Sequence, residues 1–326
     1  MHGIKQATIK KIIKRKLEFW LDTITDNHVK QIARENVIVC GGALTSLLLG
    51  EKPNDYDLYF KTYDSVLKIA EYYANKFNEA NKLKSINNYN VSIKTSSFIN
   101  INGESENRIT MYMKSAGVAS ETQDIYKYFE NLPENLTEDF TESLTERSVK
   151  DLEEHPEEII NNVTEELKIK QPYRPIFISD NAITLANKTQ LIIRFYGNSS
   201  EIFKNFDFIH AQCYYDLKEN KLECSQESLS AILSKTLIYN GSLYPIASIF
   251  RIRKFLNRGW RISAGQLLKI IWQINKLDMN NREILRDQLI GVDQAYMHQL
   301  IIALEKQNLK IDSTYIASLL DSIFDE

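Results

Sequence analysis

The chain has 326 residues, of which 43% are hydrophobic and 25% are charged, and its formal net charge is −3. These values are ordinary for a globular protein, and they exclude a disordered or fibrous chain. The length predicts about two domains, each large enough to bury its own core.

The cysteines and the hydropathy pattern restrict the class of protein further. Cys40, Cys213 and Cys224 form no C-x-x-C pair, which excludes a zinc ribbon or finger. So few cysteines are typical of a reducing compartment. No signal-peptide core is present at the start of the chain, and no apolar run approaches the ~20 residues that span a bilayer. We therefore expect a soluble, cytoplasmic protein without a membrane partner.

Charge is segregated along the chain. Residues 1–16 contain six Lys/Arg and no acid, and residues 121–170 hold fifteen Asp/Glu against five Lys/Arg, a local net charge of −10. Residues 235–276 hold eight Lys/Arg and no acid. Any one run fits a solvated helix face. The presence of two basic blocks and one acidic block in the same chain favours contact between a basic block and a polyanion.

Periodicity predicts helices and a strand in the first fifty residues. Apolar side chains recur at helical spacing over 4–21, and Asp26 is placed to cap a second helix that ends near Arg34. A short apolar strand follows at 37–40. After a glycine pair, residues 43–49 suit a helix that ends at Gly50.

The rest of the chain alternates before it becomes helical. Residues 55–60 read as a strand, and Thr62 is placed to cap a long helix to about Lys84. Further strands are predicted at 89–101, 107–119, 175–179, 182–185, 190–196, 206–215 and 222–224. From 226 onward the pattern is helical, with Pro245 and Ser263 at helix starts. The predicted organisation is a basic helical arm at 1–34, an α/β domain at 35–225 with an acidic insertion at 121–170, and an all-helical domain at 226–326.

The most informative stretch joins the glycine pair Gly41-Gly42 to the Asp55-Tyr56-Asp57 segment. Glycines after a strand let backbone N–H groups approach a phosphate where a helix N-terminus adds positive potential. Residues i and i+2 of a strand share a face, so Asp55 and Asp57 present two carboxylates side by side. Paired carboxylates together with substrate phosphates are the ligands that Mg²⁺ prefers. Each piece has a structural alternative: Gly41-Gly42 as helix–strand packing, and Asp55 as a solvated residue at a strand start.

Together these motifs resemble the head of the nucleotidyltransferase superfamily, which has a DNA polymerase β-like fold. The similarity is to the poly(A) polymerase and CCA-adding branch, whose signature is GG-x-V-R-D-x-L-L-G followed by D-x-D. Residues 206–216 resemble that family's R-D-F-T-I-N-A-L-A-Y-D strand, and residues 245–262 resemble its neck helix. The head GGALTSLLLGEKPNDYDLYF also resembles nucleotidyltransferase-like proteins of bacteriophages. The resemblance implies an α+β fold with a mixed sheet flanked by helices.

The resemblance, together with the position of neighbouring polar and basic residues, gives the candidate site residues. Asp55, Asp57 and Asp207 would bind Mg²⁺ or Mn²⁺ and carry catalysis. The candidates for nucleotide and phosphate contacts are Gly41, Gly42, Thr45, Ser46, Lys52, Arg251, Lys254 and Arg258. Two alternatives stay open for Asp207, a ribose contact and a buried structural carboxylate. Arg251, Lys254 and Arg258 share one helix side, where they either bind the triphosphate or acceptor strand or form a solvated face.

Two functions follow. The first is metal-dependent transfer of a nucleoside monophosphate from an NTP to a hydroxyl, with an RNA 3′ end as the expected acceptor. The second is a catalytically silent nucleic-acid-binding or virion-associated structural protein. Thr45-Ser46 stand where the family has Arg-Asp, Phe206 replaces the Arg before Asp207, and the base-selecting E-D-x-x-R motif is missing. These departures favour the silent protein and argue against CCA addition to tRNA, whereas the retained D-x-D favours the enzyme. A phage-encoded chain would act in the host cytoplasm or with the virion.

Overall fold

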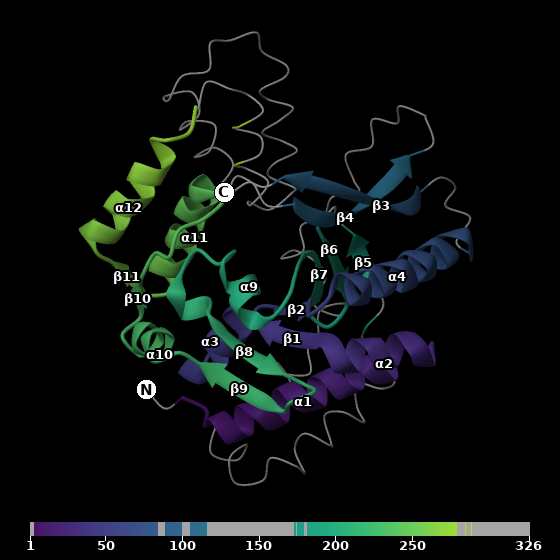
Figure 1. Cartoon of the computed structure of the whole chain (residues 1–326). Helices are drawn as coiled ribbons and strands as arrows, with labels where there is room; N and C mark the ends of the chain where they lie inside the picture. Colours follow the sequence, from purple (N-terminus) through teal and green to yellow (C-terminus); the bar gives the residue numbers. More distant parts are fainter. Residues whose placement is uncertain are drawn as a thin grey trace. The chain divides into compact units, whose positions relative to one another are not determined.

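The structure is a computed structural model that describes residues 3–83, 89–99, 105–115, 173, 175–178, 181–278, 284 and 288 (Figure 1). The described chain divides into two compact units. The first unit takes the described residues up to Lys204 together with His210–Ile232, and the second takes Asn205–Ile209 and the described residues from Leu233 onward. The predicted acidic insertion at 121–170 lies outside the described residues.

The first unit is built on a seven-stranded mixed sheet with the strand order β5-β6-β7-β2-β1-β8-β9. The strands are β1 (Val37–Cys40), β2 (Tyr56–Phe60), β5 (Pro175–Ile178), β6 (Ala182–Leu185), β7 (Thr189–Tyr196), β8 (Cys213–Asp216) and β9 (Lys221–Cys224). Neighbouring strands are antiparallel except β2 and β7, which run parallel. The predicted α+β class with a mixed sheet and flanking helices is confirmed.

Helix α1 (Gln6–Asp22) packs its apolar side against this sheet. Ile13, Leu17 and Trp20 meet Val39 of β1 and Leu58 of β2 around one small pocket. All five side chains are buried. The predicted basic arm is therefore part of the core of the first unit, because the apolar stripe of α1 needs a sheet face to bury it.

Three capped elements continue the unit. Helix α2 (Asn27–Asn36) starts at Asp26, whose carboxylate accepts from the amides of His28 and Val29. Helix α4 (Tyr63–Leu83) starts after Thr62, whose hydroxyl accepts from the Ser65 amide at 3.2 Å. Both caps were predicted from the sequence and are confirmed. Helix α9 (Ser199–Phe203) begins with a capping box at Asn198.

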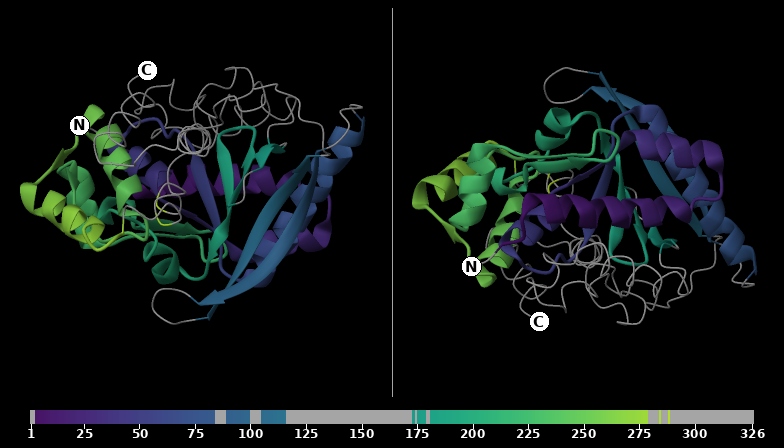
Figure 2. Two further views of the ribbon diagram at one scale, coloured as in Figure 1. Left: turned by 90° about the horizontal axis from the view of Figure 1, so that it is seen from above. Right: turned by 90° about the horizontal axis from the view of Figure 1, so that it is seen from below.

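Strands β3 (Tyr89–Ile99) and β4 (Ser105–Ser115) form a separate antiparallel ribbon. The ribbon lies beside α4 (Figure 2). Asn78 of α4 binds both backbone groups of Val91, donating to its carbonyl at 3.0 Å and accepting from its amide at 2.8 Å. This paired contact fixes the ribbon to the helix.

The predicted strand at 206–215 is wrong over its first half. Residues Ile209–Ala211 form a 3₁₀ turn, and the strand β8 begins only at Cys213. Before the turn, the Asp207 carbonyl accepts from the Asn240 amide at 2.7 Å, and the Ile209 amide donates to the Ile238 carbonyl at 3.0 Å. These backbone bonds tie the segment to residues 238–240 and take it out of the sheet.

The second unit is not all-helical in its described part. After α10 (Gln226–Leu233), strand β10 (Thr236–Leu237) pairs in parallel with β11 (Arg261–Ile262). Between them lies α11 (Pro245–Asn257), with Pro245 in its first turn, and α12 (Ala264–Ile274) follows after Ser263. The helical periodicity of this region hid two short strands, each only two residues long.

Candidate active site

Gly41 joins β1 to α3 (Gly42–Leu49) in a conformation that favours glycine. Its φ is 86° and its ψ is −146°, and it occupies the N-cap position of the helix. A methyl group added at Gly42 would meet no atom within 4 Å, so open space lies beside the first turn of α3. The helix ends at Gly50, as predicted, and Gly50 is left-handed, with φ 69°. A ligand phosphate therefore has access to the N-terminus of α3.

The Asp57 carboxylate lies next to this helix start. Strand β2 runs antiparallel to β1, and the register places Asp57 opposite Cys40, the residue before the glycine pair. Oδ2 of Asp57 is 3.6 Å from the position that a Cβ at Gly41 would take. Tyr56 and Leu58 are buried and Asp57 is partly exposed, which is the alternation of a strand whose Asp57 side chain leaves the core.

Asp55 precedes the strand instead of opening it. Strand β2 begins at Tyr56, whose amide donates to the Lys188 carbonyl at 2.8 Å. Asp55 is partly exposed, as is Asp57. Both carboxylates thus belong to one short segment at the start of β2. Their joint binding of a metal ion stays a prediction.

The thiol of Cys40, which lies opposite Asp57 in the sheet, is held in its neutral form. Burial raises the pKa of Cys40 well above its ordinary value, and the negative charge of Asp57 raises it further. A neutral thiol in the core is a poor nucleophile and a poor metal ligand. Cys40 therefore contributes packing.

Thr45 and Ser46 lie within the packed core rather than at its surface. Both side chains are buried in α3, and the Thr45 hydroxyl donates to the His210 carbonyl at 3.0 Å. This bond holds α3 against the 3₁₀ turn. The predicted phosphate contacts of these two side chains are therefore not supported, because their side of α3 packs inward. Lys52, in the loop before β2, is exposed.

Asp207 belongs to the second unit, where protein groups surround its carboxylate. Oδ1 accepts from the Ser242 hydroxyl at 3.1 Å, and Oδ2 accepts from the Ser248 hydroxyl at 2.8 Å. The Arg251 guanidinium forms an ion pair with Oδ2. Asp207 is buried, at 5% exposure, so three donors from α11 and the loop before it compensate its charge. We call this group the Asp207 clamp. Ser242 and Ser248 carry no sequence signal for such a role.

The clamp agrees with the structural alternative that the sequence left open for Asp207. Among the residues the structure describes, no group of three or more His, Cys, Asp or Glu side chains is arranged to hold a metal ion. The role of Asp207 as a third metal ligand stays a prediction.

The predicted basic stripe lies on α11. Lys254 is exposed, and Arg258 is partly exposed with its guanidinium 5.7 Å from the centre of the Phe255 ring. Arg251, the third member, is the cation of the Asp207 clamp. Arg251 therefore serves the clamp, and a phosphate-binding role for Lys254 and Arg258 stays a prediction.

The two glycines should respond differently to alanine. Gly41→Ala forces a side chain into a backbone region that is essentially limited to glycine, which costs about 1–3 kcal/mol of folding free energy. Gly42→Ala is compatible with the helix and should leave stability unchanged or slightly raised. Its methyl group would fill the open space at the helix start and weaken NTP binding.

Chemical denaturation and equilibrium binding of a fluorescent NTP measure the two effects. The pair serves as its own control, since each variant adds one methyl group. Unchanged NTP affinity in Gly42→Ala would remove the phosphate-binding role of the helix start.

Comparison with known proteins gives one family. A model of the Gabija anti-defense 2 family matches residues 11–146 and 140–235. The protein named Gabija anti-defense 2 from Bacillus phage SPbetaL7 is 27% identical over 107 residues, which cover 32% of this chain and 27% of that relative. The match thus spans about a quarter of the relative's length.

Among solved structures, the Thermotoga maritima CCA-adding enzyme complexed with tRNA aligns at a TM-score of 0.36 with 12% identity, over 89% of this chain and 53% of that one. None of the helices in the described ranges has the length and apolar character needed to cross a membrane.

Proposed function

Because the chain belongs to the Gabija anti-defense 2 family, we propose that it is a phage protein that acts against Gabija defence by metal-dependent nucleotidyl transfer. The observation that carries the chemistry is the position of Asp57, whose carboxylate lies 3.6 Å from the place of a Cβ on Gly41, at the open N-terminus of α3. This arrangement pairs a phosphate-binding backbone with a cation-binding oxygen.

The residues present suit a divalent cation. Asp55 and Asp57 supply hard carboxylate oxygens, and a triphosphate at Gly42 would complete the ligand set for Mg²⁺ or Mn²⁺. A cation bound there would neutralise charge on the triphosphate and on the departing pyrophosphate. The backbone N–H groups at the start of α3 would orient the phosphates, and the rigid strand β2 would hold the carboxylates in place.

The reaction conserves atoms without a further reactant. The bond between the α-phosphorus and its bridging oxygen breaks, and a bond from the acceptor hydroxyl oxygen to the same phosphorus forms. Pyrophosphate leaves with the electron pair of the broken bond, and the hydroxyl proton goes to solvent or a carboxylate. An RNA 3′ end is the acceptor that the basic stripe on α11 favours.

Charge reversal on the stripe tests the acceptor. Arg251 is left intact because it holds the Asp207 clamp. Lys254→Glu combined with Arg258→Glu should weaken RNA binding at least about tenfold and reduce the slope of log affinity against log salt by roughly 1.4, since each lost phosphate contact removes about 0.7 for a single strand.

Filter binding of a labelled RNA at several salt concentrations measures both quantities. The matched control is Lys11→Glu with Lys14→Glu on α1, which changes the net charge equally at exposed positions. Equal weakening in the control, or none in the test variant, would leave the stripe as a solvated face.

The anti-defence role is tested in cells that carry Gabija defence and are challenged with a phage that the defence blocks. Wild-type protein should restore plaque formation, and the Asp55→Asn, Asp57→Asn double variant, expressed at the same level, should not. Absence of rescue by the wild type would overturn the anti-defence role. Equal rescue by both proteins would overturn the chemistry alone.

A second candidate function is favoured by the Asp207 clamp. If Asp207 serves only to hold α11, the chain retains two carboxylates of the three that the resemblance implies, and a silent nucleic-acid-binding protein becomes the alternative. If this alternative holds, the Asp55→Asn, Asp57→Asn double variant should still restore phage growth. The wild-type protein should then bind RNA without attaching a labelled nucleotide to it.

A further inference from the structure

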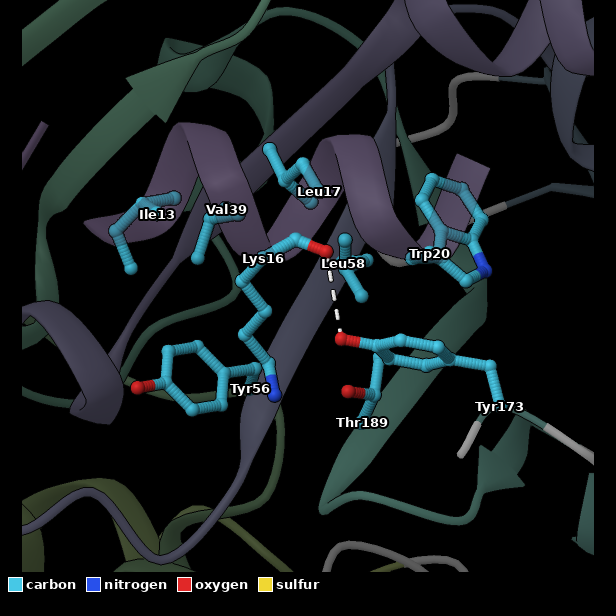
Figure 3. Close-up of a pocket in the computed structure, with 9 residues that line it drawn as sticks. All are labelled: Ile13, Lys16, Leu17, Trp20, Val39, Tyr56, Leu58, Tyr173 and Thr189. Atoms are coloured by element: carbon cyan, nitrogen blue, oxygen red, sulfur yellow. Dashed lines mark hydrogen bonds between the residues drawn. The ribbon is translucent and has the colours of Figure 1, made fainter. Parts of the chain in front are cut away.

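Lys16 is a buried cation on the core side of α1. Its residue is 2% exposed, and it lines the small pocket between α1 and the sheet together with Tyr56, Tyr173 and Thr189 (Figure 3). Transfer of an ammonium group from water into a protein core costs several kcal/mol unless polar groups and rings compensate it. The ammonium group of Lys16 is therefore expected to have compensating partners inside the core.

The ammonium group contacts the turn that leads into β7. Lys16 Nζ donates to the Asn187 carbonyl at 3.1 Å, and the Thr189 hydroxyl donates to the same carbonyl at 3.1 Å. Asn187 and Lys188 both have a positive φ, 70° and 50°. Two consecutive left-handed residues are costly for side chains other than glycine, and the two donors to Asn187 stabilise that conformation.

The same turn holds the start of β2. The Lys188 carbonyl accepts the Tyr56 amide at 2.8 Å, and Lys16 Nζ lies 4.2 Å from the centre of the Tyr56 ring. The aromatic face of Tyr56 therefore meets the cation directly. Tyr56 stands between Asp55 and Asp57 in the sequence, so its backbone sets the position of both carboxylates.

We propose that Lys16 is a positioning residue for the carboxylate pair. It fixes the Asn187–Lys188 turn and the ring of Tyr56, and through them the backbone of residues 55–57. The inference rests on the proposed metal-binding role of Asp55 and Asp57. Residues that contact the metal ligands and orient them, without contacting the metal themselves, typically contribute 10–100-fold to metal affinity.

The test is Mn²⁺ binding to the full chain, measured by calorimetry with a non-hydrolysable NTP analogue present, because the triphosphate completes the proposed ligand set. Lys16→Met keeps the length of the side chain and removes its charge. Coulomb's law alone predicts tighter Mn²⁺ binding in this variant, since a cation near the carboxylates is lost. The positioning role predicts the opposite, a loss of about tenfold or more. The matched control is Lys14→Met, the same change at an exposed position of α1, which should bind Mn²⁺ as the wild type does.

Amide hydrogen exchange over residues 55–60 gives a second readout. Exchange there should accelerate in Lys16→Met and remain unchanged in Lys14→Met. If Lys16→Met does not fold, Thr189→Val replaces it, because that variant removes the other bond to the Asn187 carbonyl and keeps the side-chain size. In Thr189→Val we then expect a smaller loss of Mn²⁺ affinity and a smaller acceleration of amide exchange over residues 55–60.

The outcomes separate the two claims. The positioning role is overturned if Lys16→Met binds Mn²⁺ as tightly as the wild type or more tightly, and the metal site is then left intact. The same criterion applies to Thr189→Val where that variant takes the place of Lys16→Met. A wild type that binds no Mn²⁺ overturns the metal site, and the positioning role falls with it.

Discussion

Replacing Asp55 or Asp57 with asparagine should lower nucleotidyl transfer by orders of magnitude while the fold survives. Asparagine keeps the shape of the side chain but removes the ligand charge, and Mg²⁺ binds charged oxygen far better than a neutral amide. Transfer is measured as label from each α-labelled NTP that becomes covalently attached to RNA in Mg²⁺ or Mn²⁺.

Asp64→Asn is the matched control, because Asp64 is an exposed carboxylate at the start of α4. It should transfer at the wild-type rate. The two site variants should unfold at the wild-type denaturant concentration or slightly above it, since carboxylates that share one segment repel each other until a cation binds. Full activity in Asp57→Asn would exclude it from the catalytic machinery.

Removing the Asp207 carboxylate should have the largest effect on stability. In Asp207→Ala the hydroxyls of Ser242 and Ser248 and the guanidinium of Arg251 lose their common acceptor. Loss of one partner from a buried, hydrogen-bonded ion pair costs about 3–5 kcal/mol. Because Arg251 is partly exposed, we expect the lower end of that range, about 3 kcal/mol, in chemical denaturation without metal or nucleotide.

A double-mutant cycle with Arg251→Ala isolates the pair. The two substitutions should be non-additive by about 1–3 kcal/mol, as for groups that share one network. A stable Asp207→Ala variant that has lost nucleotidyl transfer would instead support Asp207 as the third metal ligand, and would contradict the clamp as its main role.

The sequence predicted the local features of the fold well. The caps at Asp26 and Thr62 and the left-handed end of α3 at Gly50 depend on side chains within a few residues, so short patterns specify them. The strand predicted at 206–215 failed over its first half because the backbone groups of Asp207 and Ile209 pair with residues 238–240 instead of with the sheet. Periodicity carries no information about such distant contacts.

The candidate site shows the same division. Gly41 and Asp57 were found because a glycine pair and a D-x-D segment have recognisable spacing, and the structure places them side by side. Thr45 and Ser46 were assigned to phosphate by their position after the glycines, yet the inward face of α3 buries both. The Thr45 hydroxyl binds the His210 carbonyl, which lies 165 residues further along the chain, so the sequence around α3 did not reveal that these residues pack inward.

Lys16 was missed although a signal was present. It lies three residues after Ile13 and four after Ile12, in the middle of the apolar stripe of α1. The sequence analysis counted it only as one of the basic residues of the N-terminal block. A lysine at a core position of an amphipathic helix marks a buried cation, and a partner for it should be sought in the structure.

The most direct test of the metal site is thermal unfolding of the full chain with and without Mg²⁺ in the presence of an NTP. A ligand that binds only the folded state stabilises it by about 2.7 kcal/mol at one hundred times its dissociation constant. We predict a metal-dependent rise in Tm for the wild type and none for the Asp55→Asn, Asp57→Asn double variant. A wild type without such a rise, or a double variant with the same rise, would contradict the assignment of these two carboxylates to the metal.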